Sequence, residues 1–236
     1  MTKYVVLLLC LFFSFPLAHA QEETNGEALN ERYLEDQFYA SLGYNFVLEK
    51  PEVVIQRNLS YNLQLGFIKD IPFNQKRNFG IGLGFGYAAN SYYTNLLALE
   101  TGPGVVNYRL ANSDETINRS KLETHAIEFP FEIRWRTSNA VEYKFWRVYG
   151  GFKMSYLFSR KSILSAENIA DFEGNSSFSN PTIQQWQYGF MLNFGYNTWN
   201  LHVYYALSTL LDENALFEGE QLQFRPLRIG VIFYIL

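Results

Sequence analysis

The feature that most constrains this chain is a strict two-residue alternation between apolar residues and polar or small ones. Between Phe79 and Tyr87, every odd position is aromatic or aliphatic and every even position in between is glycine. A period of two places successive side chains on opposite faces of a β-strand. With this segment, the pattern predicts eight strands, the others at residues 38–48, 59–67, 127–135, 146–156, 186–196, 201–207 and, less regularly, 222–236.

The connections between these strands alternate in length. Short ones are expected at residues 70–78, 137–144 and 197–200, and longer ones at 50–57, 98–120, 160–181 and 211–221. Long loops on one side and short turns on the other are typical of bacterial outer-membrane barrels, whose short turns face the periplasm. The expected fold is therefore an all-β, eight-stranded antiparallel transmembrane outer-membrane β-barrel over residues 37–236, with short periplasmic turns and longer outer loops.

Alternation alone also fits a soluble secreted barrel or sandwich, in which the apolar face would form the core. Composition favours the membrane. Aromatic residues make up 18% of the chain and gather on the apolar faces, while charged residues are only 18% and the opposite faces carry glycine. Tryptophans at both ends of the expected strands predict the aromatic girdles of the two membrane interfaces: Trp135, Trp146 and Trp199 on the periplasmic side and Trp186 on the outer side.

The first twenty residues have the pattern of a secretory signal peptide. Lys3 precedes an apolar run over residues 4–17, and Ala18-His19-Ala20 follows as a small-x-small cleavage site. The run is shorter than the ~20 residues that a spanning helix needs, which disfavours a retained anchor. We expect cleavage after Ala20, a polar periplasmic lead-in over residues 21–36, and location in the outer membrane of a Gram-negative bacterium.

Few residues remain for catalysis or metal binding. The single cysteine, Cys10, lies in the expected leader, and His125 and His202 are the histidines of the mature chain. His125 shares the apolar face of its strand and is expected to face outward, and His202 is expected to be structural. Net charge is −4 with no block of Lys or Arg. We therefore expect no enzyme activity, metal, cofactor or small-molecule substrate, and no nucleic-acid partner.

Charged residues on the inner faces of two neighbouring strands predict a network inside the barrel. An eight-stranded barrel has an interior that side chains can fill, and charges that face it need partners. A hairpin centred near residues 140–141 would place Glu128 opposite Lys153 and Glu132 diagonal to Arg147. A structural plug of ion pairs is favoured over a gated polar track. The candidate network comprises Glu128, Glu132, Arg134, Arg147 and Lys153.

The strand from Ile127 to Trp135 carries a Glu-x-Pro-x-x-x-Arg pattern that resembles the outer-membrane β-barrel superfamily common in Bacteroidetes. More specifically, the chain is similar to the PorT family of the type IX secretion and gliding-motility system. Beyond residues 127–135, the matching stretches are residues 65–72, 134–138, 143–149, 194–205 and 229–236. The resemblance implies no enzyme and no cofactor. It implies an outer-membrane component needed to export proteins that carry a C-terminal sorting domain.

A narrow, filled barrel cannot itself pass folded cargo. An accessory or assembly subunit is therefore expected, with outer-membrane lipid and other secretion-system proteins as partners. Its periplasmic turns offer basic and aromatic residues for docking: Lys76, Arg77, Tyr143 and Lys144. The alternative is a generic surface barrel for adhesion or envelope integrity that acts through the outer loops at residues 98–120 and 160–181.

Overall fold

The computed structural model describes residues 37–74, 76–137, 146–169 and 172–235. The expected signal peptide and lead-in lie outside these residues, as do Tyr143 and Lys144 of the expected docking turn. Within the described part of the chain, no helix has the length and apolar character to cross a membrane.

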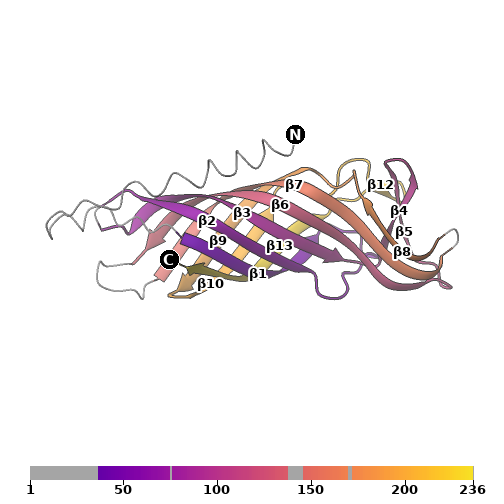
Figure 1. The fold of residues 1–236 in the computed structure, drawn as a ribbon, viewed down its shortest axis with the longest axis horizontal. Helices are drawn as coiled ribbons and strands as arrows, with labels where there is room; N and C mark the ends of the chain where they lie inside the picture. Colours follow the sequence, from indigo (N-terminus) through magenta and orange to yellow (C-terminus); the bar gives the residue numbers. More distant parts are fainter. Residues whose placement is uncertain (1–36, 75, 138–145, 170–171, 236) are drawn as a thin grey trace, which may run out of the picture. The chain divides into compact units, whose positions relative to one another are not determined.

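Eight antiparallel strands close into a barrel (Figure 1). Their order around it is β6-β3-β2-β1-β13-β10-β9-β7, and pairing between β6 and β7 completes the ring. The expected fold class is confirmed. The barrel strands are β1 (Gln37–Leu48), β2 (Tyr61–Pro72), β3 (Phe79–Tyr93), β6 (Thr116–Arg136), β7 (Trp146–Ile169), β9 (Trp186–Tyr196), β10 (Trp199–Ala206) and β13 (Arg225–Ile235).

The first and last strands lie side by side. β1 pairs with β13 from Phe38 opposite Ile235 to Leu48 opposite Arg225. The even number of strands therefore brings the start of β1 and the end of β13 to the same end of the barrel, together with the short β2–β3, β6–β7 and β9–β10 connections. In outer-membrane barrels this short-turn end faces the periplasm.

The strands place apolar side chains outside the barrel and polar side chains inside, the reverse of a soluble protein. β9 alternates without interruption between exposed and buried residues, and its exposed set includes Phe190, Leu192 and Phe194. Its buried set includes Gln187 and Asn193. A continuous apolar exterior of this kind would be an aggregation hazard in water and is the surface that lipid requires. The soluble alternative is therefore wrong, because the apolar face is the outer one.

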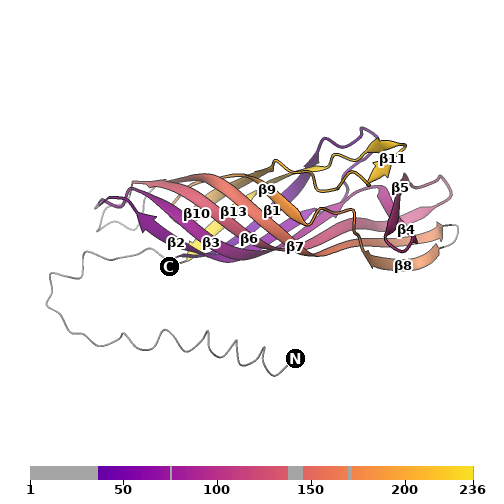
Figure 2. The ribbon, with the colours of Figure 1, turned by 90° about the horizontal axis from the view of Figure 1, so that it is seen from above.

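The outer connections contain strands that the alternation did not predict. β6 and β7 continue well past the apolar belt, and β8 (Phe172–Ser179) pairs with the outer part of β7. β4 (Leu96–Gly102) and β5 (Val105–Leu110) form a hairpin, and β11 (Leu216–Phe217) pairs with β12 (Glu220–Gln221). Figure 2 shows these elements gathered at the end opposite the short turns. The expected loops at residues 98–120 and 160–181 are thus largely strands.

A hydrophobic cluster, the outer cap, fills the outer mouth of the barrel. Inward-facing Tyr92, Ala126 and Leu157 pack there against apolar side chains from the outer connections. The connection between β10 and β13 contributes much of the cap, including Leu222 and Phe224, neither of which is exposed. The other buried members are Val47, Val54, Leu96, Ala98, Tyr108, Leu122, Ile183, Leu210, Leu211, Ala215 and Phe217.

Candidate functional site

The candidate site is the barrel lumen between the outer cap and the short turns. Buried charges project into it from β2, β6, β7 and β13, because the inward positions of these strands carry them. Three carboxylates meet five cations there, each no more than 6% exposed: Asp70, Glu128 and Glu132 with Arg134, Arg136, Arg147, Lys153 and Arg228.

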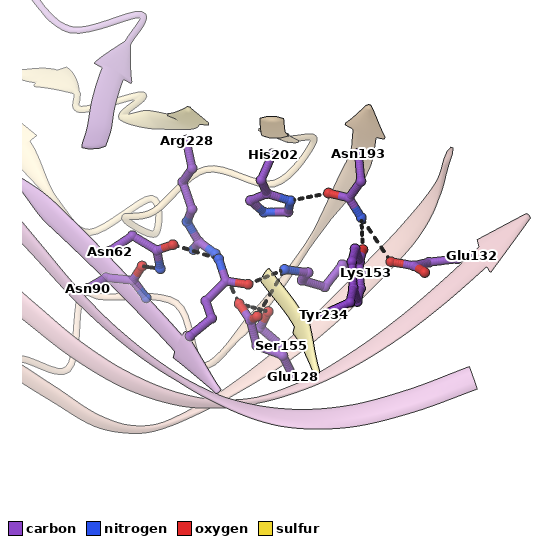
Figure 3. A network of polar contacts seen from close by, with 11 residues as sticks. Asn62, Asn90, Glu128, Glu132, Lys153, Ser155, Asn193, His202, Arg228 and Tyr234 are labelled. Atoms are coloured by element: carbon purple, nitrogen blue, oxygen red, sulfur yellow. Dashed lines mark hydrogen bonds and ion pairs between the residues drawn. The ribbon is translucent and has the colours of Figure 1, made fainter. Parts of the chain in front are cut away.

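Glu128 is the centre of the outer half of this network (Figure 3). Its Oε2 lies 3.0 Å from Lys153 Nζ, and its Oε1 lies 3.0 Å from Arg228 Nη1. The Ser155 hydroxyl donates to Oε1 at 3.4 Å. Arg228 comes from β13, so this carboxylate joins the β6–β7 pair to a strand 100 residues away in sequence. Each oxygen of this buried carboxylate thus lies 3.0 Å from a cation, and a charge out of water requires such pairing.

The register between β6 and β7 differs from the expected one by two residues. Glu128 lies opposite Ser155 rather than Lys153, and Glu132 lies opposite Gly151. Lys153 still reaches Glu128, from the diagonal position. Arg147 lies opposite Arg136 and out of diagonal reach of Glu132. A shift of two residues keeps every side chain on its own face, so alternation cannot distinguish the two registers.

Glu132 has different partners from those expected. Arg134 Nε donates to its Oε2 at 2.8 Å, from two residues along the same strand. The Asn193 amide of β9 donates to Glu132 Oε1 at 3.0 Å and to the Tyr234 hydroxyl at 2.9 Å. His202 Nδ1 lies 2.5 Å from Asn193 Oδ1. His202 therefore contributes to the lumen network, as its expected structural role implies.

Asp70 anchors the periplasmic end of the network and was not predicted. Its two carboxylate oxygens accept from Arg134 Nη1 at 3.1 Å and Arg136 Nη2 at 2.6 Å. Arg136 Nε also donates to the carbonyl of Arg77 at 2.5 Å, which ties the network to the β2–β3 turn. Asp70 has the parity of Asn62 and Gln64, so extending the inner face of β2 along the sequence would have found it.

Arg228 was the second omission. The alternation in the last segment is poor, because Ile232 and Tyr234 share the inward parity with Arg228 and are apolar or aromatic. The signal available was the charge itself, since an arginine within the apolar part of a membrane strand points to the interior.

The five cations exceed the three carboxylates, and aromatic rings face the excess positive charge. The Arg228 guanidinium lies 4.5 Å from the centre of the Tyr204 ring, and that of Arg134 lies 4.6 Å from the centre of the Tyr149 ring. Cation–π contacts are worth most where water is excluded. The buried tyrosines therefore stabilise guanidinium groups in a lumen where cations outnumber carboxylates.

Arg147, the fifth member of the expected network, lies nearest the short turns. Its Nη1 donates to the carbonyl of Asn197 at 2.8 Å, and its guanidinium lies 5.7 Å from the centre of the Tyr234 ring. It thus connects the lumen to the β9–β10 turn.

Neutral amides extend the network along β2 and β3. Lys153 Nζ donates to Gln64 Oε1 at 2.7 Å, and the Gln64 amide donates to Asn62 Oδ1 at 2.6 Å. Asn62 donates in turn to Asn90 Oδ1 at 2.7 Å, and Asn90 reaches the Thr124 hydroxyl at 3.3 Å. This chain carries polar contacts from the charged centre to the base of the outer cap.

Glycines on the inner face provide the space for these side chains. A Cβ at Gly82 would lie 2.6 Å from Arg134 Nε, and one at Gly66 would lie 2.5 Å from the Tyr39 ring. The alternating glycines of β3 are therefore a packing requirement and not a phosphate-binding loop.

The expected docking residues divide into two pairs. Lys76 is exposed in the β2–β3 turn, next to Arg77, which has a positive φ of 54°. Tyr143 and Lys144 belong to the part of the β6–β7 connection that the structure does not describe.

The described lumen has the chemistry of a plug. Its carboxylates are paired with cations, two of its guanidinium groups also lie against tyrosine rings, and the described residues contain no group of three or more His, Cys, Asp or Glu side chains arranged to hold a metal ion. Outside the lumen, His125 faces outward on β6 with its Nδ1 2.5 Å from the Tyr87 hydroxyl and its Nε2 3.5 Å from Glu123.

Comparison with known protein families agrees with this inverted architecture. The model of the outer membrane protein beta-barrel domain family matches residues 19–212. The chain belongs to this family. Its place in the outer membrane follows, and so does the assignment of the exposed apolar belt to lipid.

Two further comparisons add little beyond the family. No curated protein matches the chain. Among solved structures, one similar to this outer-membrane barrel is the crystal structure of Ail, the attachment invasion locus protein of Yersinia pestis, in complex with the heparin analogue sucrose octasulfate. The match has 13% identity and a TM-score of 0.35, and it covers 85% of this chain and 99% of that one.

Proposed function

We propose that this protein is a closed, non-enzymatic outer-membrane scaffold that acts as an accessory or assembly subunit of the type IX secretion and gliding-motility machinery. The observation that carries the proposal is the filled lumen. Ion pairs occupy its periplasmic half and the outer cap fills its outer mouth. A barrel filled in this way supplies no path for folded cargo, so its work is done by its surfaces.

The assignment to type IX secretion rests on the resemblance to the PorT family, which includes the segments at the short turns. The β2–β3 turn is built as a firm contact surface. Phe73 N donates to the Phe79 carbonyl at 2.9 Å, and the buried Arg136 holds the carbonyl of Arg77 from below. Lys76 and Phe73 are exposed on this turn. Secretion-system proteins of the periplasm are the proposed partners, after removal of a signal peptide that ends at Ala20.

The first experiment is the extracellular proteome of a clean deletion strain and its complemented control. Loss of secreted proteins that carry C-terminal sorting domains, with other outer-membrane proteins unchanged, supports the proposal. An unchanged set of secreted proteins contradicts it.

A charge reversal at the turn tests the docking surface itself. Lys76→Glu should reduce secretion while the barrel still folds, because the exposed lysine makes its contacts outside the barrel. Lys161→Glu is the matched control, since Lys161 is exposed on the outer part of β7. Equal secretion by the two variants would remove the β2–β3 turn as a docking site.

A second candidate, a surface barrel for adhesion or envelope integrity, is favoured by one observation. The outer connections are folded into strands and are not loose loops. β8 lies at the edge of this outer sheet, so a flexible Gly-Ser segment could replace residues 172–179 while the eight barrel strands stay intact. Loss of surface binding with normal secretion in that variant would support the second candidate over the first.

A further inference from the structure

A small cavity lies beside the outer strands, apart from the lumen network. It has a volume of about 190 Å³ and is formed by three segments: the β1–β2 connection, the corner between β3 and β4, and the segment from the end of β5 into β6. Drug-sized pockets span roughly 300–1,000 Å³, so this one fits only a compact ligand. Its polar lining includes Arg57, Arg119, Asn58, Asn95 and Asn118.

The charges around this cavity are one-sided. Arg57 and Arg119 both line it, and none of its lining residues is acidic, although the whole chain has a net charge of −4. Neither guanidinium has an ion-pair or hydrogen-bond partner within the described residues. The planar guanidinium group of arginine binds phosphate and similar oxyanions through paired hydrogen bonds. Two exposed guanidinium groups without a partner among the described residues thus line one cavity, which is the arrangement that a compact anion would need.

The frame of the cavity is held in place by hydrogen bonds. The Asn95 side chain accepts from Ile55 N at 2.7 Å and donates to the Val53 carbonyl at 3.0 Å. Arg57 N donates to the Tyr93 carbonyl at 3.1 Å. These bonds join the β1–β2 connection to the β3–β4 corner, so the segment that carries Arg57 is positioned before any ligand arrives.

The opposite wall is shaped by a β-bulge. The register of β6 against β7 shifts between Ile117 and Arg119, which leaves Asn118 as the extra residue. The Asn118 amide donates to Glu167 Oε1 at 3.1 Å. Bulges bend a strand and redirect its side chains, and they are frequent beside binding sites.

Two carboxylates near this wall already have partners: Glu167 accepts from Asn118, and Glu115 of the β5–β6 connection forms a bidentate ion pair. Arg109 donates to the two oxygens of Glu115 at 2.7 and 2.6 Å, and Asn112 N donates to the same carboxylate at 2.7 Å. This pair closes the β5–β6 connection, and the arginine lowers the pKa of Glu115 to about 2. The acid of this connection is thereby committed to Arg109 and does not neutralise the cavity.

We propose that this cavity binds a saccharide bearing a phosphate or a similar compact oxyanion. The two guanidinium groups would take the anion, and the Asn58 side chain beside them would hydrogen-bond sugar hydroxyls. Arg119 lies eight residues beyond Ile127, the last exposed apolar residue of β6. That is roughly 26 Å along the strand at about 3.3 Å per residue, and less in height above the apolar belt because barrel strands are tilted. Such a height suits the sugars of an outer-leaflet glycolipid and soluble glycans alike. Binding at this cavity does not depend on any role in secretion.

The test uses the full-length mature barrel in phospholipid nanodiscs and titrates glucose 1-phosphate, glucose and inorganic phosphate by calorimetry. Glucose 1-phosphate should bind more tightly than glucose alone or inorganic phosphate alone. Arg57→Gln and Arg119→Gln should each weaken its binding about tenfold, the loss of one charge-assisted contact. Lys161→Gln removes an exposed outer cation that does not line the cavity and should bind as the unaltered barrel does.

A second arm separates the two sources of the ligand. In nanodiscs that contain lipopolysaccharide, loss of glucose 1-phosphate binding identifies an outer-leaflet glycolipid as the natural occupant, and unchanged binding identifies a soluble glycan. The proposal is overturned if the unaltered barrel in phospholipid fails to bind the sugar phosphate. It is also overturned if both arginine variants bind as well as Lys161→Gln.

Discussion

The two halves of this barrel are filled by opposite means. The periplasmic half holds charges that are each at most 6% exposed, paired across strands that are distant in sequence. The outer mouth holds apolar side chains delivered by the connections between strands. Charges in a lumen demand specific partners, whereas apolar side chains demand only volume and contact. The periplasmic half is thus organised by pairing and the outer half by packing.

This difference predicts that a single substitution affects different numbers of strands in the two halves. Removal of the Glu128 charge leaves its cations uncompensated on two other strands, β7 and β13. Removal of one apolar side chain leaves a cavity that neighbours partly close. The following variants break or sharpen this comparison.

The largest effect is expected for Glu128→Gln. Lys153 and Arg228 would both lose their carboxylate, and breaking a buried pair costs about 3–5 kcal/mol. The free energy of unfolding, measured by urea titration in lipid vesicles, should fall by that amount. Glu123→Gln is the matched control, because Glu123 pairs with Lys121 on the outside of the same strand and should cost less than about 1 kcal/mol. Equal stability of the two variants would show that the lumen charges are dispensable.

A smaller and more local effect is expected for Leu222→Ala in the outer cap. The side chain is completely buried, and a Leu→Ala change in a core costs about 2–5 kcal/mol. Hydrogen exchange should accelerate in the outer connections more than in the barrel strands. Gln221→Ala, at the exposed neighbouring position, should leave exchange unchanged. Uniform acceleration across all eight strands would mean that the cap and the lumen unfold as one unit.

Two adjacent glycines of β7 face opposite sides of the barrel wall: Gly151 faces the lumen and Gly150 faces lipid. A Cβ at Gly151 would collide with the backbone carbonyl of Phe131, whereas one at Gly150 would meet only Leu192 Cδ1 at 3.8 Å. Gly151→Ala should therefore destabilise the barrel by about 1–3 kcal/mol, the usual cost of overpacking. Gly150→Ala should be close to neutral. Thermal unfolding of the pair in identical micelles measures the difference, and the reverse order would invalidate the packing of β7 against β6.

The smallest effect concerns pH and lies outside the membrane. Arg109 lowers the pKa of Glu115 from 4.5 to about 2. Because the folded pKa lies below the ordinary one, the pair contributes fully above about pH 4.5 and is lost as the pH falls through about 2. A carbon-detected NMR titration of Glu115 should have its midpoint near 2. In Arg109→Gln the midpoint should move toward 4.5, and no movement would assign the shift to another group.

Much of the fold was predictable because alternation is a local signal. The parity of Phe79–Tyr87 or of β9 determines which face meets lipid without reference to the rest of the chain. The β6–β7 register was not predictable from it, since a shift of two residues preserves parity. The lumen partners were harder still. Glu128 and Arg228 are separated by 100 residues, so only the closed ring brings them together.

The outer elements escaped prediction for another reason. The chain in β4, β5 and β8 does not face lipid, so it lacks the apolar alternation that marks the barrel strands. Its burial depends on contacts within the outer cap, and these follow from the position of each segment over the mouth. Both the apolar cap and the cavity beside it are therefore properties of the assembled fold.

The pairing of β1 with β13 has a consequence for the order of assembly. Arg228 lies on β13, the final strand of the barrel in sequence order, and its partner Glu128 lies on β6. Until β13 docks against β1 and β10, Glu128 lacks one of its two cations, and water still reaches the lumen through the open seam. Dehydration of the interior and closure of the ring are consequently the same event. A chain truncated before Arg225 should stall as an open, hydrated sheet.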